Sequence, residues 1–273
     1  MTTVLDEIIV GVREDLEVRR SEVSLERIRD RAAETTRRSP ARDAYAALSG
    51  GRTDPAGVRM ITEVKRSSPS KGALAEIASP AELARDYEAG GAAAISVLTE
   101  SRRFRGSLAD LDAVRAAVDV PVLRKDFTVD EYMIYEARAH GADLVLLIVA
   151  ALDDAQLAAF LDLTHELGMN ALVEAHTPEE IERAVAVDAK IVGVNVRNLK
   201  TLEIHPENYA TLAPHLPEGV VRVAESGVQG AEQVAGYARD GADAVLVGEA
   251  LVRHGDPVGA IRDFRAASTA VRR

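Results

Sequence analysis

The chain has 273 residues, of which 47% are hydrophobic and 28% charged, and its 33 basic and 44 acidic side chains give a formal net charge of −11. This composition is typical of a soluble globular protein with one large core. The acidity argues against nucleic acid as a partner, because a phosphate backbone needs a basic protein face. Without cysteine, the chain has neither disulfides nor thiolate metal ligands.

The sequence has no segment suited to a membrane. Its longest uninterrupted apolar run, residues 144–152, is far shorter than the roughly 20 residues that a membrane helix needs. The first residues do not show the basic and then apolar pattern of a signal peptide. We therefore expect a cytoplasmic protein with no membrane partner.

Residues 1–48 have the pattern of an N-terminal helical extension that packs on the rest of the protein. Ser39 and Pro40 interrupt this pattern, and a second short helix is expected to end near Leu48. The apolar positions that recur at helical spacing before the interruption are Val4, Ile8, Ile9, Val12 and Leu16.

From residue 49 onward, short β-branched runs alternate with amphipathic helical stretches. The eight runs are centred near Thr62, Val97, Val122, Leu146, Val173, Val192, Val223 and Val245. Such alternation predicts βαβ units and a parallel sheet. We predict an α/β fold in which residues 49–273 form a (β/α)8 TIM barrel, the catalytic domain. An open doubly wound sheet is less favoured, since no glycine-rich nucleotide loop follows the first strand.

Several helix and strand boundaries can be predicted from local motifs. Ser79-Pro80 and Thr177-Pro178 place a capping hydroxyl before a proline, and Glu180 is expected to complete a capping box with Thr177. Thr128 and Glu131 predict a similar box after the third strand. Three related turns, at Gly91, Gly141 and Gly241, are expected to end helices in a left-handed conformation.

Only five of the basic residues are lysines, and three of these lie where predicted strands run into loops: Lys65, Lys71 and Lys125. Arginine does not readily lose its proton, whereas the amine of lysine can become an acid or a nucleophile when it is buried. Since a (β/α)8 barrel carries its chemistry at the carboxyl ends of its strands, Lys65 and Lys125 are candidate catalysts, with a solvated edge charge as the alternative for either one.

Other polar residues end the predicted strands as well. Glu63 and Lys65 lie on the same face of one strand and can form a pair that orients a proton donor, with a purely structural ion pair as the alternative. The remaining strand-end polar residues are Thr99, Glu100, Asp126, Glu174, Asn195, Arg197, Glu225, Ser226 and Glu249. A positive focus for an anionic small molecule is expected from Lys65, Arg66, Lys71, Arg124, Lys125 and Arg197.

A phosphate site is predicted where small residues follow the seventh and eighth strands. Ser226, Gly227 and Gly248 are suited to cradle a phosphate with backbone N–H groups, and Ser68 and Lys71 can approach from the first loop. The six histidines show no spacing typical of metal ligands, so no metal is predicted. His176, near the predicted mouth, is expected to have a surface or supporting role.

The strand ends of this sequence closely resemble those of the indole-3-glycerol-phosphate synthase family. The matching stretches are residues 63–70 (EVKRSSPS), 97–100 (VLTE), 104–107 (FRGS), 123–127 (LRKDF), 172–174 (LVE), 193–199 (GVNVRNL) and 224–227 (AESG). The resemblance implies ring closure, decarboxylation and dehydration of a phosphorylated anilino-sugar, without a cofactor, in tryptophan biosynthesis.

The resemblance also implies roles for individual residues. Lys125 would be the general acid of ring closure, and we expect partial burial to lower its pKa toward the useful range. Lys65 and Glu174 would serve the dehydration, with Glu63 orienting Lys65. Asn195 would complete the catalytic set by holding a hydroxyl. The expected substrate-binding residues are Glu225, Arg197, Ser226, Phe104, Phe127, Leu146 and Leu199. The expected phosphate-binding residues are Ser68, Lys71, Ser226, Gly227, Gly248 and Glu249.

Two positions depart from the family pattern. Asn198 replaces a usual aspartate, which puts the internal hydrogen bonds of the sixth loop in question, and Thr62 replaces a small apolar residue. Two alternatives also stay open at this point. One is a phosphosugar isomerase or Schiff-base aldolase, and the other is a barrel that only binds a phosphorylated ligand.

Overall fold

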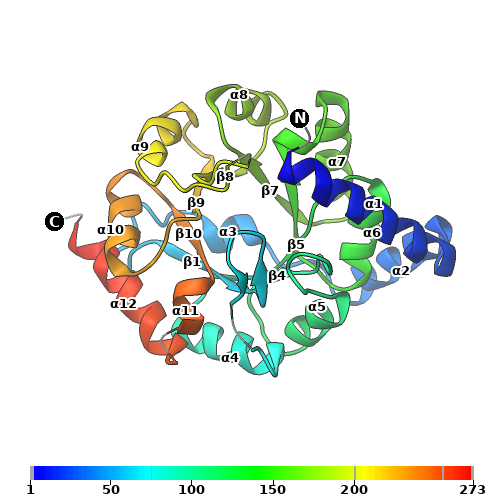
Figure 1. Cartoon of the computed structure of the whole chain (residues 1–273), viewed down its shortest axis with the longest axis horizontal. Coiled ribbons are helices and arrows are strands. Elements are labelled where there is room, and N and C mark those ends of the chain that lie inside the picture. The colour runs from blue at the N-terminus through cyan, green and yellow to red at the C-terminus, as the bar shows by residue number, and fades with distance from the viewer. Residues whose placement is uncertain (1–2, 75, 200, 254, 272–273) are drawn as a thin grey trace.

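The computed structural model describes residues 3–74, 76–199, 201–253 and 255–271. In this part of the chain, eight parallel strands form a closed barrel with helices around it, which confirms the predicted (β/α)8 class (Figure 1). The barrel strands are β1 (Arg59–Val64), β4 (Ala94–Leu98), β5 (Val122–Lys125), β6 (Leu144–Ile148), β7 (Asn170–Ala175), β8 (Ile191–Asn195), β9 (Val221–Glu225) and β10 (Ala244–Val247). Pairing of β1 with β10 closes the barrel.

The helices that follow these strands form the outer layer. They are α4 (Pro80–Gly90), α5 (Leu108–Arg115), α6 (Glu131–Ala139), α7 (Asp154–Glu166), α8 (Pro178–Ala186), α9 (Asn208–Leu212), α10 (Ala231–Arg239), α11 (Glu249–Arg253) and α12 (Pro257–Ala270). A short hairpin of β2 (Ser67–Ser68) and β3 (Gly72–Ala73) lies in the first loop, and 3-10 turns cover Val149–Ala151 and Ala213–His215. Among the helices described, none is long and apolar enough to span a membrane.

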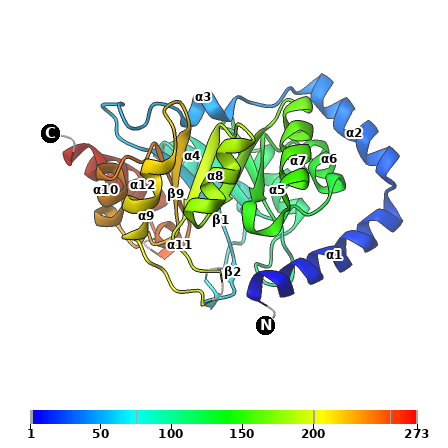
Figure 2. The same ribbon diagram turned by 90° about the horizontal axis from the view of Figure 1, so that it is seen from above.

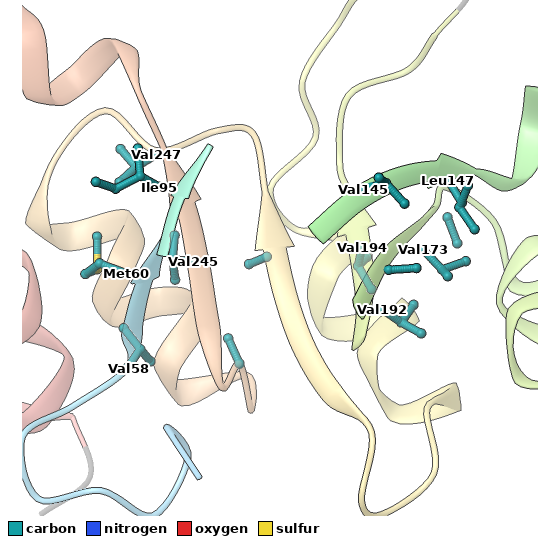
Figure 3. Close-up of a cluster of buried hydrophobic side chains, with 14 of the residues drawn as sticks. Val58, Met60, Ile95, Val145, Leu147, Val173, Val192, Val194, Val245 and Val247 are labelled. Atoms are coloured by element: carbon teal, nitrogen blue, oxygen red, sulfur yellow. The ribbon is translucent and has the colours of Figure 1, made fainter. Parts of the chain in front are cut away.

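Each barrel strand contributes alternate side chains to two different cores. Outward-facing residues such as Met60, Ile95 and Val173 belong to the layer between sheet and helices (Figure 3). Inward-facing residues such as Ile61 and Leu123 fill the barrel interior. Because the side chains of a strand alternate with a period of two, polar residues that continue the inner rows are directed into the barrel mouth.

The N-terminal segment extends from one end of the barrel to the other (Figure 2). It contains α1 (Val4–Glu22), α2 (Leu25–Arg38) and α3 (Ala44–Leu48). We expected one helix up to Ser39, but a break occurs at Val23, and the Ser24 side chain caps α2 by accepting a hydrogen bond from the backbone of Arg27. Ser24 is thus an N-cap that was not predicted.

All three helices of the extension contact the barrel, and α2 packs along α6. Ala44 and Leu48 of α3 are fully buried and share the interior core of the barrel. Ile8 and Val12 of α1 pack with Met133 of α6 near the other end. The division of the chain into domains near residue 48 remains a prediction.

The predicted helix boundaries are correct in part. Ser79 and Thr177 are the N-caps of α4 and α8, but α6 is capped by Asp130, so the box expected from Thr128 is wrong. Thr177 accepts a hydrogen bond from the backbone of Glu180, whose own carboxylate accepts from His176 instead of completing the box. The three turn glycines have φ angles of 96°, 80° and 91°, as predicted.

Candidate active site

A cavity of about 390 Å³ lies at the carboxyl ends of the barrel strands. All the residues for which a catalytic or a binding role was predicted line this one cavity. They are Glu63, Lys65, Ser68, Lys71, Phe104, Lys125, Phe127, Leu146, Glu174, Asn195, Arg197, Leu199, Glu225, Ser226, Gly227, Gly248 and Glu249. Their individual roles remain predictions.

Two of the six cations expected in the positive focus are located elsewhere. Arg124 points outward from β5 and is buried between Asp126 and Glu136, with nitrogen-to-oxygen distances of 3.2 and 2.9 Å. Arg66 pairs with Asp110 on α5 at 2.5 Å. Arg66 follows Lys65 and Arg124 precedes Lys125. Because adjacent residues in extended chain face opposite sides, each arginine points away from the cavity that its neighbouring lysine lines.

Glu63 and Lys65 form the predicted pair at the end of β1. Lys65 Nζ lies 2.5 Å from Glu63 Oε1, and the hydroxyl of Ser96 donates to Glu63 Oε2 at 3.3 Å. Burial alone would raise the pKa of Glu63, but the ammonium groups of Lys65 and Lys125 bring it below the ordinary value. Glu63 is therefore an anion that holds the Lys65 amine in one orientation. Ser96, on the inner face of β4, was not anticipated.

Lys125 is surrounded by carboxyl groups from three other strands. Its Nζ atom lies 3.4 Å from Glu225 Oε2, 3.7 Å from Glu174 Oε2 and 4.0 Å from Glu63 Oε2. Burial would lower the pKa of Lys125, but these carboxyl groups raise it above the ordinary value. The expected lowering of this pKa is therefore wrong, since the charges outweigh desolvation. Lys125 is kept as an ammonium ion.

Glu174 and Glu225 are both buried but differ in protonation. For Glu225, burial and the neighbouring Glu174 carboxylate raise the pKa to about 8, against the opposing effect of Lys125. For Glu174, burial is outweighed by Lys125 and His176, which bring the pKa well below its usual range. At neutral pH Glu225 on β9 is therefore a neutral carboxyl group and Glu174 on β7 is a carboxylate. Only the carboxylate is in the form required of a base.

His176 contributes to the difference in protonation between Glu174 and Glu225. A surface or supporting role was predicted for it. Its Nε2 atom lies 3.4 Å from Glu174 Oε1, and its Nδ1 atom lies 3.0 Å from Glu180 Oε2. The side chain is largely buried, so a surface role is wrong. The position of His176 two residues after Glu174, just past the end of β7, was the available signal, because residues two apart in extended chain point to the same side.

The loop after β9 is held by the last residue of β8. Asn195 Oδ1 accepts hydrogen bonds from the Ser226 hydroxyl at 2.8 Å and from the backbone of Arg197 at 3.1 Å. Ser226 has a φ angle of 71°, and its carbonyl accepts from the Tyr237 hydroxyl at 3.1 Å. These bonds support an unusual backbone conformation next to Gly227.

One side of the cavity is apolar. The rings of Phe104 and Phe127 are 6.0 Å apart with an interplanar angle of 41°, and Leu146 and Leu199 line the same cavity. Val4, Leu5 and Ile8 of α1 also line it. The sequence analysis recognised two of these three α1 residues as helix positions but could not place them at the mouth.

Ion pairs attach α1 to the loop that carries Phe104. Arg103 pairs with Glu7 at 3.0 Å, and Arg102 pairs with Glu14 at 2.6 Å. Glu100 accepts hydrogen bonds from the backbone of Arg102, Arg103 and Phe104 and so orders this loop.

The opposite side of the cavity is polar and rich in small residues. Ser68 and Lys71 approach from the first loop, and Gly227 and Gly248 follow β9 and β10. Lys71 Nζ donates to Glu249 Oε1 at 2.7 Å and so joins the first loop to the start of α11. This side offers a cation and closely approachable backbone to an anion.

Asn198 does not disrupt the sixth loop. Its side-chain oxygen accepts from the backbone of Thr201 at 3.2 Å, and its own backbone N–H donates to Glu203 at 2.8 Å. An aspartate carboxylate could accept the first of these bonds equally well. Within the described ranges, no group of three or more histidine, aspartate or glutamate side chains is arranged to hold a metal ion.

The closed barrel and the acid–base groups at its mouth define the class of protein as a (β/α)8-barrel enzyme. Among solved structures, 3-hexulose-6-phosphate synthase from Salmonella typhimurium is similar with a TM-score of 0.64 at 16% identity, over 78% of this chain and 100% of that one. Thiamine phosphate pyrophosphorylase from Pyrococcus furiosus has a TM-score of 0.59 at 16% identity, over 78% and 96%. At these identities the likeness shows the fold alone.

The sequence comparisons are more specific. Residues 5–264 match the family model described as indole-3-glycerol phosphate synthase. The chain is 72% identical to the indole-3-glycerol phosphate synthase of Micrococcus luteus over 99% of this chain and 100% of that one, and 63% identical to that of Paenarthrobacter aurescens over 98% and 97%. The chain belongs to the indole-3-glycerol phosphate synthase family, and with it to the carboxy-lyases of tryptophan biosynthesis.

Proposed function

We propose that this chain converts 1-(2-carboxyphenylamino)-1-deoxyribulose 5-phosphate into indole-3-glycerol phosphate, CO2 and water, with the charged groups of the cavity as acids and base. Family membership supports the reaction. The observation that carries the assignment of roles is the position of Lys125, whose Nζ atom lies within 4.0 Å of carboxyl groups on β1, β7 and β9. An ammonium donor beside an ionised carboxylate can serve both halves of the chemistry.

Ring closure is the first step. The ring carbon that bears the carboxylate attacks the ketone carbon of the sugar, and the amine nitrogen supplies the electron density. Lys125 donates a proton to the ketone oxygen, which becomes a hydroxyl. Loss of CO2 then returns its bonding electrons to the ring and restores aromaticity. No cofactor is proposed, since the substrate itself provides these electrons.

Dehydration is the second step. Lys65, held by Glu63, donates a proton to the departing hydroxyl, and Glu174 removes a proton from the adjacent carbon as the new double bond forms. The two lysines thus give two protons and Glu174 receives one. Turnover takes up one proton from solution, because the substrate carboxylate leaves as neutral CO2.

The remaining residues bind the substrate in this proposal. Asn195 and Glu225 hold hydroxyls, and Arg197 attracts the carboxylate. The apolar side receives the anthranilate ring, through Phe104, Phe127, Leu146 and Leu199. The polar side binds the phosphate, through Ser68, Lys71, Ser226, Gly227, Gly248 and Glu249. A cytoplasmic location stays a prediction from the sequence.

Fluorescence tests this function directly. The chain contains no tryptophan, so newly formed indole should emit over a low, tyrosine-only background. Incubation with the anilino-ribulose phosphate should give steadily rising indole emission. Saturable binding with a flat trace would instead favour a protein that only binds the ligand. Borohydride should trap no covalent adduct on Lys125 or Lys65, whereas an aldolase would form one.

A further inference from the structure

His176 lies between two carboxylates and outside the cavity lining. Its Nδ1 atom and its backbone nitrogen contact the same oxygen of Glu180, Oε2, at 3.0 and 2.7 Å. Two contacts to one acceptor restrict both the ring and the chain at this position. Glu180 is itself fixed in the first turn of α8, where its backbone N–H donates to Thr177. The imidazole is therefore held from the helix side and directs Nε2 toward the barrel interior.

The two oxygens of Glu174 consequently have different environments. Oε1 lies 3.4 Å from His176 Nε2, and Oε2 lies 3.7 Å from Lys125 Nζ. The contact with His176 is an ion pair and not a hydrogen bond, because Nε2 has no hydrogen-bond partner among the described residues. Its charge still attracts Oε1 toward the ring, while Oε2 faces Lys125 at the cavity. The two carboxyl oxygens of Glu225 also have no hydrogen-bond partner among the described residues, and Oε2 forms an ion pair with Lys125 Nζ at 3.4 Å.

We infer that His176, held by Glu180, is a positioning residue that orients Glu174 and makes Glu174, rather than Glu225, the proton acceptor of the reaction. This inference rests on the proposed function. Without the imidazole, the two buried carboxyl groups would differ mainly in their distances to Lys125, and the retained proton could occupy either one. A proton on Glu174 would block the dehydration step.

The charges around this unit come from several elements. Lys125 on β5 faces Glu174 and Glu225, and Glu63 on β1 faces Lys125. Glu180 on α8 faces His176. Burial lowers the pKa of His176, but Glu174 and Glu180 outweigh burial and raise it to about 10. The ring is thus a cation at neutral pH and lowers the pKa of Glu174, which agrees with the geometry.

The pH dependence of turnover tests the inference. His176→Gln keeps a side-chain donor but removes the charge. We expect kcat to fall about tenfold with KM little changed, and the acidic limb of the profile to move up by about one pH unit, because Glu174 loses an adjacent cation. His176→Lys retains a positive charge and should move the acidic limb back toward the wild-type position. His140→Asn, which breaks a histidine–carboxylate pair with Asp112, is the matched control and should leave the profile unchanged.

A second measurement needs no turnover. Histidine titration followed by NMR, with His176 assigned from the spectrum of the Gln variant, should show no titration of His176 between about pH 5 and pH 9 in the wild type. Glu180→Gln and Glu174→Gln should each bring its titration into that range. Ordinary titration of His176 in the wild type, or a Gln-variant profile that superimposes on the wild type, overturns the inference. Absence of synthase activity in the wild type would instead contradict the proposed function and leave the NMR result valid.

Discussion

A Cβ atom on Gly193 would lie 1.9 Å from Oε1 of Glu225. The carboxyl group of Glu225 thus occupies the space that any other residue at position 193 would need. Gly193 is paired in register with Glu174 on the neighbouring strand. The missing side chain on β8 therefore leaves room for the buried carboxyl groups of β7 and β9 to approach each other.

Gly193→Ala should displace Glu225 and disturb the cavity. We expect a loss of about 1–3 kcal/mol in the free energy of unfolding from overpacking, and a fall in kcat of about tenfold or more. Urea denaturation and the indole assay measure the two effects. Gly236→Ala is the matched control, because nothing lies near a Cβ there and α10 should gain stability from alanine. Wild-type behaviour of the Gly193 variant would contradict the packing argument.

Lys125→Ala should lower kcat by about 10² or more and change KM little, because the amine acts mainly in the transition state. Steady-state kinetics with the indole assay checks this. Lys190→Ala removes an exposed lysine that pairs with Asp188, and it should have wild-type kinetics. Full activity of the Lys125 variant would remove this residue from the mechanism.

Glu225→Gln should change the pH dependence of stability. The pKa of Glu225 is raised to about 8 in the folded protein, so its stabilising contribution is complete below the ordinary value of 4.5 and is lost as the pH rises through 8. Glutamine does not titrate. The variant should therefore gain stability relative to the wild type between these pH values and keep that gain above them. Urea titrations across this pH range measure the difference in the free energy of unfolding between variant and wild type. Glu232→Gln, at an exposed position, is the control. A difference that does not change with pH would contradict the raised pKa of Glu225.

Thr62→Val should stabilise the protein. Thr62 is fully buried, and its hydroxyl oxygen has no hydrogen-bond partner among the described residues. Replacing this hydroxyl with a methyl group should add about 1 kcal/mol to the free energy of unfolding and raise Tm by about 2–4 °C. Calorimetry measures the shift. Thr164 is equally buried, but its hydroxyl donates to Phe160 at 2.6 Å, so Thr164→Val should show no gain.

Lys71→Met tests the phosphate side of the cavity. Loss of the cation should raise KM about tenfold with a small effect on kcat, since the phosphate does not react. Inhibition by inorganic phosphate should weaken in parallel. The Lys190 variant again serves as the control, and an unchanged KM would exclude Lys71 from phosphate binding.

Much of the site could be predicted from the sequence, because the relevant signals are local. The period-two alternation of a strand placed Glu63 and Lys65 on one face, and the position of Lys125 at a strand end marked it as a candidate catalyst, without any knowledge of their neighbours. The eight apolar, β-branched runs predicted the eight strands, because this signal is also local. The helix break at Val23 was not predicted, and Thr128 was predicted as the cap of α6 in place of Asp130. Several possible capping residues lie close together at each point, and packing decides which of them is used.

The directions of the pKa shifts required the tertiary structure. The pKa of Lys125 is raised by carboxyl groups from three other strands, and that of Glu174 is lowered by Lys125 and His176. Such shifts depend on burial and on distances between residues far apart in the chain. The sequence by itself determined which residue types stand at the strand ends. Only closure of the barrel decided how close their charges come, because electrostatic energies depend on separation in space.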